Sequence, residues 1–441
     1  MKTSFRRFST LAVLAWSGYL PIALAGTAAR DQIQRQFTVT TGARLVLDAD
    51  VGDVEFKAGD ASEFKITIDR EVKCSTADEG KKALSRHQIT FDQTGDTVTI
   101  KATNPGIGGK IHLWNSPMFQ VHYTLIVPRQ TRAELKTSGG QIRVGDLSGT
   151  LSAHTSGGDI SVATFQGEVH LSTSGGSIEL KSASTAALST SGGNIVAGHV
   201  DGSIEAKTSG GNIDLREAGG AVRVKTSGGD IHLGKLGGTV RAETSGGGIR
   251  VSSVAGEAAL ETSAGDIQVE HAGVSLRAST SGGGIHVGSV VGDAGLETSG
   301  GDIHVDRVGG SLRASTSGGG IGVDHASGSV EVKSTAGDIK IADSAGKVRG
   351  QTSGGGIHLG LTKDHASEVD LSTSGGDITV ALAPTGKYDV DAHASGGDVT
   401  TDVPVTTSGK VGGETLKGQL NGGGSPLRLK TSGGSVHIRR L

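Results

Sequence analysis

Histidines at a regular spacing are the first residues in this sequence that could take part in chemistry. The chain repeats with a period of about 18 residues, and His286 and His304 hold the same position in adjacent repeats. His271 and His325 likewise recur three repeats apart. Histidine is a common metal ligand, but a metal site needs three or four converging ligands. Corresponding positions in the neighbouring repeats hold Arg250, Gln268, Gly322 and Lys340 instead of histidine. We therefore expect these histidines to be solvated surface residues, and we assign no metal ligand, no cofactor and no catalytic residue.

Aspartates that follow pairs of glycines raise the question of calcium, because the turns of calcium β-rolls are also about 18 residues long. In this chain the aspartate occurs only in alternate repeats, as at Asp230, Asp266 and Asp302, and glycine takes its place at Gly248 and Gly284. The closely spaced carboxylates that surround Ca²⁺ in such proteins are therefore missing. A calcium-stabilised β-roll stays open as an alternative.

Sugar chemistry is the other alternative, in the form of a polysaccharide-acting β-helix enzyme. Such an enzyme needs clustered acids beside a basic residue, and it usually has aromatic platforms for the sugar. Residues 137–380 contain one aromatic residue, Phe165. Repeats rich in Ser, His and Asp also generate apparent catalytic triads by chance, so we expect a protein that is not an enzyme.

A compact group of large apolar residues lies outside the repeats. Trp114, Met118 and Phe119 come at and just after the end of a loop that runs from Asn104 to Pro117. This group is a candidate binding site. The alternative is that it packs the N-terminal region against the first repeat.

The repeats themselves predict the elements that hold these side chains. The tetrapeptide Thr-Ser-Gly-Gly, or a close variant, starts at Thr137 and recurs up to Thr352 at this period, broken once by a slightly shorter spacing. Within residues 226–243, apolar Ile231 and Leu233 flank His232, which is the alternation of a half-buried strand, and a second such run follows. The sequence predicts an all-β, parallel β-solenoid with rungs of about 18 residues and two short strands per rung. Threonine is expected to point inward, and the glycine pairs are expected at turns that need φ > 0.

A longer period, of two repeats, supports parallel stacking in register. Arg241, Arg277 and Arg313 occupy every second repeat, as the aspartates do. Identical positions in a parallel solenoid are about 4.8 Å apart, so the two-repeat spacing dilutes the repulsion between like charges.

The segment before the repeats is less rich in glycine and predicts an irregular, β-rich N-terminal cap with one short helix. Thr76 and Glu79 form a capping box that starts a helix ending near His87. We expect an N-terminal capping region at 26–136 and a solenoid at 137–441, with regular rungs over 137–372 and looser rungs over 373–441. The expected strands of the cap are 37–49, 53–58, 63–69, 88–102 and 119–127.

Residues 1–25 predict export. Basic residues precede an apolar run from Leu11 to Leu24, and Ala23-Leu24-Ala25 fits a cleavage site before Gly26. We therefore expect residues 1–25 to be a signal peptide and the product to be periplasmic, exposed on the cell surface or secreted. No other apolar stretch is long enough to span a bilayer as a helix.

Composition excludes several classes of protein. The 441 residues include 74 Gly but only 7 Pro, which does not fit collagen, and hydrophobic residues at 34% do not fit a flexible linker. Removal of residues 1–25 takes three positive charges away, so the formal balance changes from 42 − 45 to 39 − 45, or −6. This acidity argues against nucleic acid as a partner. Cys74 is the only cysteine, so no intramolecular disulfide can form.

Three segments of the chain carry a family resemblance. They are FTVTTGARLVLDADVGDVEF, a strand that ends in Val127-Pro128 and is followed by Leu135-x-Thr137-x-x-Gly140, and the closing NGGGSPLRLKTSGGSVHI. Together they resemble a bacterial family of exported, adhesin-like proteins of unknown function with glycine-rich β-strand repeats. The resemblance implies a β-solenoid at the cell envelope, and it brings no catalytic residues. From it we expect an adhesin-like or structural scaffold protein that binds an envelope polymer or cell-surface component at many points.

Overall fold

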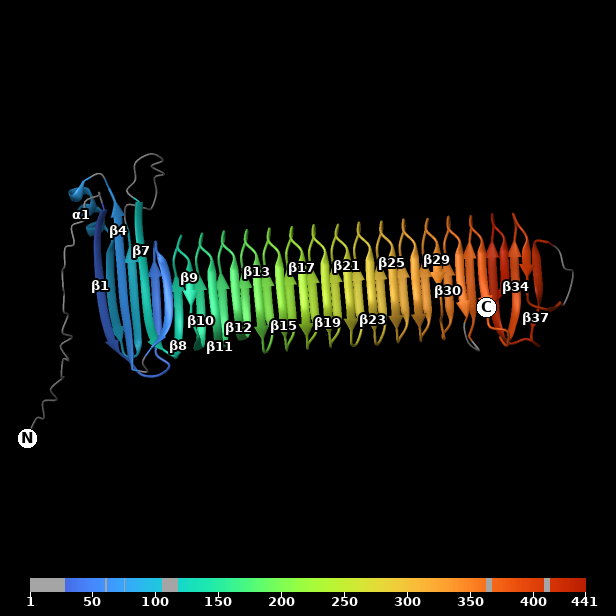
Figure 1. The fold of residues 1–441 in the computed structure, drawn as a ribbon, viewed down its shortest axis with the longest axis horizontal. Coiled ribbons are helices and arrows are strands. Elements are labelled where there is room, and N and C mark those ends of the chain that lie inside the picture. Colours follow the sequence, from blue (N-terminus) through green and yellow to red (C-terminus); the bar gives the residue numbers. More distant parts are fainter. Residues whose placement is uncertain (1–27, 60–61, 75, 105–117, 362–366, 408–412) are drawn as a thin grey trace, which may run out of the picture. The chain divides into compact units, whose positions relative to one another are not determined.

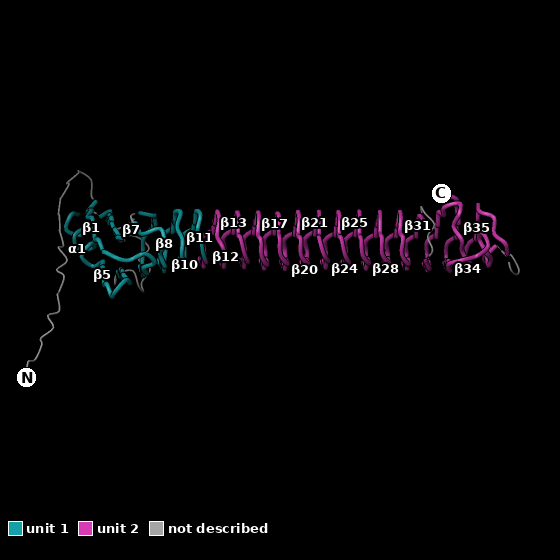
Figure 2. The backbone as a smooth tube through the Cα atoms, turned by 90° about the horizontal axis from the view of Figure 1, so that it is seen from below, with its two compact units in different colours: residues 1–167 teal, residues 168–441 magenta. Residues whose placement is uncertain are grey.

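A computed structural model describes residues 28–59, 62–74, 76–104, 118–361, 367–407 and 413–441. Strands account for 61% of the structure and helix for 3%. The chain divides into two compact units, residues 1–167 (unit 1) and residues 168–441 (unit 2), which Figure 2 shows in teal and magenta. The expected signal peptide, residues 1–25, lies outside the described residues.

Unit 1 is built from two sheets. One has the strand order β1–β4–β7–β3–β9, antiparallel from β1 to β7 and parallel from there on. The other has the order β5–β6–β2–β8–β10, in which only the β5–β6 pair is antiparallel. The strands are β1 (Ala28–Thr38), β2 (Arg44–Ala49), β3 (Asp53–Gly59), β4 (Glu63–Lys73), β5 (Gln88–Thr94), β6 (Thr97–Thr103), β7 (Met118–Pro128), β8 (Gln130–Lys136), β9 (Ile142–Val144) and β10 (Leu147–His154).

Two of the expected strands of unit 1 were wrong in their bounds. The run 37–49 is interrupted by a turn between β1 and β2, with Gly42 at φ 84°, and the run 88–102 is a β5–β6 hairpin with Gly95 at φ 59°. Both glycines adopt the left-handed conformation that a tight turn requires. In both turns the residues are small or polar, so the alternation of polar and apolar residues continues through the turn. The sequence pattern alone therefore does not show where one strand ends and the next begins.

The predicted helix is confirmed. Helix α1 (Ala77–Arg86) starts at Thr76, whose hydroxyl accepts a 3.3 Å hydrogen bond from the amide of Glu79. Gly80 lies so close to β1 that a Cβ there would be 2.5 Å from the Cβ of Ala29. The described helix is too short and too polar to cross a membrane.

Unit 2 is a parallel β-solenoid, as predicted, and Figure 1 shows its strands stacked side by side. Each regular rung contributes a first strand and a second strand, and each of these pairs with its counterpart in the next rung. The first strands are β13 (Ile195–Val200), β15 (Ile213–Ala218), β17 (Ile231–Leu236), β19 (Ile249–Val254), β21 (Ile267–Ala272), β23 (Ile285–Val290), β25 (Ile303–Val308), β27 (Ile321–Ala326), β29 (Ile339–Ile341), β31 (Ile357–Leu361) and β33 (Ile378–Leu382). The second strands are β14 (Ile204–Lys207), β16 (Val222–Lys225), β18 (Val240–Glu243), β20 (Ala258–Glu261), β22 (Leu276–Ser279), β24 (Ala294–Glu297), β26 (Leu312–Ser315), β28 (Val330–Lys333), β30 (Val348–Gln351) and β32 (Val369–Thr373).

Two longer strands precede this regular pattern. They are β11 (Ile160–Ser172), which contributes to both units, and β12 (Ile178–Ser189), which pairs with both β13 and β14. The β12 strand therefore supplies both strands of one rung without a break.

The core of unit 2 is the narrow space between the first-strand and second-strand sheets. Ile231, Leu233 and Leu236 from a first strand and Val240 and Ala242 from a second strand are all at most 3% exposed. The register places an isoleucine on an isoleucine in each successive first strand. A core filled by such small β-formers explains how the chain folds with so few aromatic residues.

Threonine and glycine hold successive rungs together at the Thr-Ser-Gly-Gly turns. Thr226 is buried, and its hydroxyl donates to the carbonyl oxygen of Gly211 at 2.8 Å and accepts from the amide of Gly229 at 3.3 Å. A Cβ on Gly229 would lie 2.1 Å from that same carbonyl oxygen, whereas a Cβ on Gly228 would be no closer than 3.4 Å to the rung before it. The second glycine is therefore required by the contact between rungs.

The expectation that these glycine pairs supply a positive φ was wrong. Among the described residues, the glycines with positive φ lie outside the Thr-Ser-Gly-Gly turns; they are Gly42, Gly52, Gly95, Gly149, Gly167, Gly422 and Gly423. Close packing of backbone on backbone, rather than a left-handed turn, explains the glycine at this corner.

The aspartates that alternate with glycine also connect rungs. The Oδ1 atom of Asp266 accepts a 2.8 Å hydrogen bond from the amide of Gly284, and Asp302 does the same for Gly320. Asn212 accepts the equivalent bond from the amide of Asp230. These side chains therefore satisfy backbone donors of the next rung.

The C-terminal rungs are not stacked in sequence order. Strand β38 lies between β32 and β34, and β39 lies between β33 and β35. Two further strands form antiparallel pairs, β37 with β34 and β36 with β37. The strands are β34 (Tyr388–Ala394), β35 (Val399–Thr401), β36 (Val405–Thr407), β37 (Thr415–Leu420), β38 (Ser425–Thr431) and β39 (Val436–Arg440).

Candidate functional site

A groove crosses six neighbouring second strands of unit 2, from β18 to β28. Its volume is about 570 Å³, and the second and fourth residues of each strand form its walls. These positions face outward because the first and third residues of each strand are buried. The groove therefore follows the direction in which the rungs stack.

Alternating large and small side chains create the groove. Arg241, Arg277 and Arg313 take the second position in every other strand, and Ala259 and Gly295 take it in the strands between. Neighbouring strands are about 4.8 Å apart, so the arginines recur about every 10 Å with a low floor between them. A Cβ on Gly295 would be 3.9 Å from Cγ of Arg277, so this arginine lies beside the gap.

Ion pairs hold the charged side chains near the two ends of the groove. Arg241 donates from Nε to Glu243 at 2.6 Å, and Arg313 donates from Nε to Glu331 at 3.0 Å. The pKa of Glu243 is lowered mainly by a hydrogen bond from Lys225 and then by one from Arg241. The pKa of Glu331 is likewise lowered, mainly by the hydrogen bond from Arg313.

The centre of the groove is different. Within the described residues, Arg277, Glu261 and Glu297 form no ion pair. Ser279 lies between the two glutamates in the strand register. The centre thus presents a guanidinium donor, two carboxylate acceptors and a hydroxyl to solvent, which is a set suited to binding polar groups.

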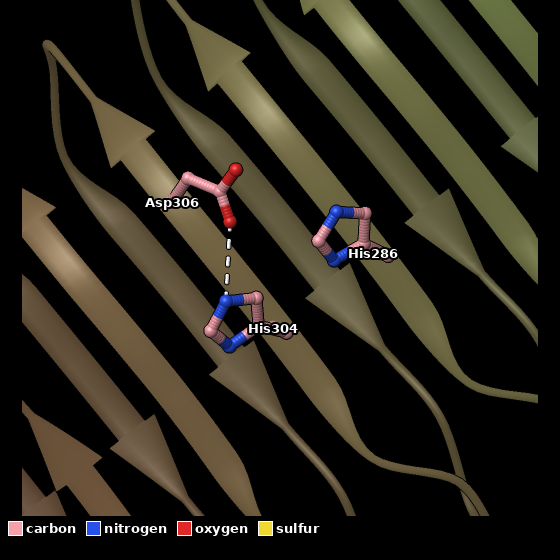
Figure 3. A group of neighbouring side chains, drawn as sticks. All are labelled: His286, His304 and Asp306. Atoms are coloured by element: carbon pink, nitrogen blue, oxygen red, sulfur yellow. Dashed lines mark ion pairs between the residues drawn. The ribbon is translucent and has the colours of Figure 1, made fainter.

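A second cluster lies on the first-strand sheet. The register pairs His286 of β23 with His304 of β25, and their rings are stacked 5.3 Å apart at an angle of 4°. Asp306 lies beside the ring of His304, and its Oδ1 atom is 3.1 Å from Nε2 of that ring. Figure 3 marks this ion pair with a dashed line. One candidate ligand atom from each of the three residues lies within 4.8 Å of the other two.

Sequence reasoning identified the two histidines but missed Asp306. The signal was present, because residues two apart on a strand share a face, and Asp306 follows His304 by two. The groove was also not predicted from the sequence. The recurrence of arginine in every second repeat indicates a spacing of like charges, but it does not by itself show that small residues between the arginines form a groove.

The predicted binding group is described only in part. Trp114 lies outside the described residues. Met118 begins β7, and nothing is described of its side chain. Phe119 is half-buried and makes an edge-to-face contact with His87, with ring centroids 5.1 Å apart at 76°.

A comparison with protein-family models assigns the chain to a family. The model of the Toastrack DUF4097 family matches residues 43–321 and 275–439, which together cover residues 43–439. The chain belongs to the Toastrack DUF4097 family. No curated protein matches this family member in sequence.

Three solved structures are similar to this Toastrack chain at low identity. A candidate adhesin from Bacteroides fragilis NCTC 9343 is 14% identical over 54% of this chain and 94% of its own, with a TM-score of 0.27. A candidate cell adhesion protein from Clostridium sporogenes ATCC 15579 is 10% identical over 93% and 100%, with a TM-score of 0.16. A candidate lipid binding protein from Parabacteroides distasonis ATCC 8503 is 14% identical over 72% and 97%, with a TM-score of 0.18.

Proposed function

We propose that this chain is a non-enzymatic, exported, adhesin-like protein of the cell envelope that binds a hydroxyl-rich polysaccharide along the groove of unit 2. The observation that carries the proposal is the alternation of Arg277 with Ala259 and Gly295. It produces a shallow channel with charged groups on its walls, and this arrangement repeats along the stack of rungs.

The charges of the groove favour a hydroxyl-rich partner over a polyanion. Arg241, Arg277, Arg313 and Lys333 supply four positive charges, and Glu243, Glu261, Glu297 and Glu331 supply four negative charges, so the formal sum is zero. A sugar hydroxyl both donates and accepts, and it can use guanidinium and carboxylate groups alike. A polymer that carries only negative charge would meet four carboxylates.

Repetition supports binding at several points. Arginines that recur about every 10 Å along the stack can each hold a different unit of one extended polymer. Weak contacts that are linked in this way add to a much tighter overall attachment. Trp114, Met118 and Phe119 are proposed as a second contact point on unit 1.

The test is binding to an array of immobilised bacterial envelope polysaccharides, both neutral and acidic. Arg277→Ala should weaken binding to the preferred glycan about tenfold or more, because a hydrogen bond to a charged group contributes about 1.5–3 kcal/mol. Arg223→Ala is the matched control, since Arg223 holds the same register position on β16 but lies outside the groove. Equal affinity of the Arg277 variant and the wild type would overturn the proposal.

The same samples test the enzymatic alternative. Incubation with each bound glycan should release no shorter fragments. Release that disappears in a Glu261→Gln or Glu297→Gln variant would establish a polysaccharide-acting enzyme in place of a binding protein.

Export is tested by fractionation of producing cells. We expect the mature protein in the periplasm, on the surface or in the medium, with Gly26 as its first residue. A cytoplasmic product that retains residues 1–25 would contradict this part of the proposal.

A further inference from the structure

The cluster of His286, His304 and Asp306 contains two histidines, whereas the residues that line the groove include none. Two imidazoles and a carboxylate are the ligands that zinc and its neighbours among the transition metals prefer. Among the described residues, this is the group whose nitrogen and oxygen atoms converge closely enough to hold a metal ion.

The parallel register preorganises the two histidines. His286 and His304 are directly paired on neighbouring strands, so their Cα atoms are held one strand spacing apart. Ligands at about 2.1 Å from a tetrahedral zinc ion are about 3.4 Å from one another. The candidate ligand atoms are at most 4.8 Å apart. All three side chains are at least partly exposed, so rotation of the side chains can close the remaining distance.

Small residues leave room around the cluster. Gly322 is paired with His304 on the next strand, and a Cβ there would be 2.7 Å from Nδ1 of His304. The imidazole therefore occupies space that any other residue at position 322 would fill. On the other side, Gly288 holds the position of Asp306 in the preceding rung, so this neighbouring position adds no side chain beside the carboxylate.

A further carboxylate is within reach. The Oδ2 atom of Asp324 is 3.8 Å from Nε2 of His304, and its side chain is 60% exposed. It can complete the ligand set or hold the ring through a hydrogen bond, as carboxylates beside metal-bound histidines commonly do.

We propose that His286, His304 and Asp306 form a binding site for a divalent transition-metal ion, with Zn²⁺ as the reference ion and one coordination position open to solvent. The site lies on the first-strand sheet and is independent of the polysaccharide groove on the second-strand sheet. A three-ligand site with an open position can accept a ligand from another molecule.

The experiment is calorimetric titration of the metal-free, full-length protein with ZnCl₂, together with Co²⁺ absorption spectra that report coordination. We expect one Zn²⁺ per chain at this site. His286→Gln, His304→Gln and Asp306→Asn should each weaken its binding tenfold or more. His232→Gln is the control, because its ring nitrogen Nδ1 is 2.8 Å from Asp214 and no second histidine is in register with it.

A second variant tests the geometry without removing a ligand. Gly322→Ala places a methyl group against the ring of His304 and should weaken Zn²⁺ binding while circular dichroism stays unchanged. The proposal is overturned if the wild type binds no Zn²⁺, or if affinity and Co²⁺ spectra are the same in the wild type and the three ligand variants.

Discussion

The hydroxyl of Thr226 donates a 2.8 Å hydrogen bond to the carbonyl oxygen of Gly211, which belongs to the preceding rung. The same carbonyl oxygen is 2.1 Å from the position that a Cβ on Gly229 would take. The carbonyl oxygen of Gly211 thus explains why two positions of the repeated tetrapeptide hold threonine and glycine. The threonine hydroxyl donates a hydrogen bond to this oxygen, and the glycine has no Cβ atom that would collide with it.

Removal of the threonine hydroxyl should destabilise the rung locally. In Thr226→Val, the buried oxygen of Gly211 loses its donor and the amide of Gly229 loses its acceptor, at a cost of about 1–3 kcal/mol. Hydrogen exchange read by mass spectrometry should show faster exchange in the two adjoining rungs. Thr226→Ser should restore protection, because Ser334 makes the equivalent 2.8 Å bond to Gly319. Similar exchange in the valine and serine variants would contradict this account.

The two glycines of the tetrapeptide should respond differently to alanine. Gly229→Ala forces a methyl group against the backbone of the preceding rung and should cost about 3 kcal/mol. Gly228→Ala should cost less than about 1 kcal/mol, because its nearest contact would be 3.4 Å away. Chemical denaturation followed by circular dichroism compares the pair. Ala264 and Ala336 already occupy the first-glycine position in this chain, so a severe effect at Gly228 would overturn the distinction.

The fold could be predicted from the sequence wherever it depends on local alternation. The alternation of Ile231, His232 and Leu233 predicts which face of the strand is buried and which is exposed. The regular repeat predicts the residue of the next rung with which each residue pairs. The role of Gly229 could not be derived in this way. The distance from the Cα atom of Gly229 to the preceding rung is set by the packing of two chain segments. The alternation of polar and apolar residues around Gly229 carries no information about this distance.

The candidate sites were harder to predict because they arise between rungs. Arg277 and Gly295 belong to adjacent rungs, and only the stacked register shows that one lies beside the gap left by the other. The order of the C-terminal rungs is a similar case. The residues of β38 do not by themselves indicate that this strand inserts between β32 and β34. A place at the end of the stack and a place between these two strands differ only in contacts with residues distant in the sequence.

Loss of an aspartate that connects two rungs should release one amide. In Asp266→Ala, the amide of Gly284 loses its 2.8 Å acceptor, which should cost about 1 kcal/mol and speed exchange of that amide. Asp266→Asn should behave like the wild type, because Asn212 already makes the same bond to the next rung. NMR-detected exchange at Gly284 separates the two variants. Equal exchange in the alanine and asparagine variants would show that the bond contributes nothing.

Calcium removal should leave unit 2 unchanged. The Oδ1 atoms of Asp266 and Asp302 are engaged with backbone amides, and the two residues are two rungs, or about 10 Å, apart. Carboxylates that share a Ca²⁺ ion must each approach it to about 2.3–2.6 Å. Thermal unfolding in EGTA and in excess Ca²⁺ should therefore coincide. A higher midpoint with Ca²⁺ would instead favour a calcium-stabilised β-roll.

Acid should destabilise unit 1 through His87. The residue is 3% exposed, and within the described part of the chain neither ring nitrogen has a hydrogen-bond partner. Burial, followed by the nearby charge of Arg70, lowers the pKa of His87 to about 4. The unfolded chain takes up this proton near pH 6.5. The neutral ring therefore stabilises the fold above pH 6.5, and this contribution, about 3 kcal/mol in full, is lost as the pH falls towards 4.

His87→Leu isolates the contribution of the histidine. Other acid-sensitive groups near it, such as Asp31 in its ion pair with Arg70, titrate in both proteins and cancel in the comparison. The backbone oxygen of His87, which accepts from Nη1 of Arg70, is retained in the variant. Hydrogen exchange of β4 and β7 between pH 7 and pH 4 should show a steeper loss of protection in the wild type than in the variant, after correction for intrinsic exchange rates. Parallel pH profiles would mean that His87 is protonated in the folded state and that its burial does not set the acid stability of unit 1.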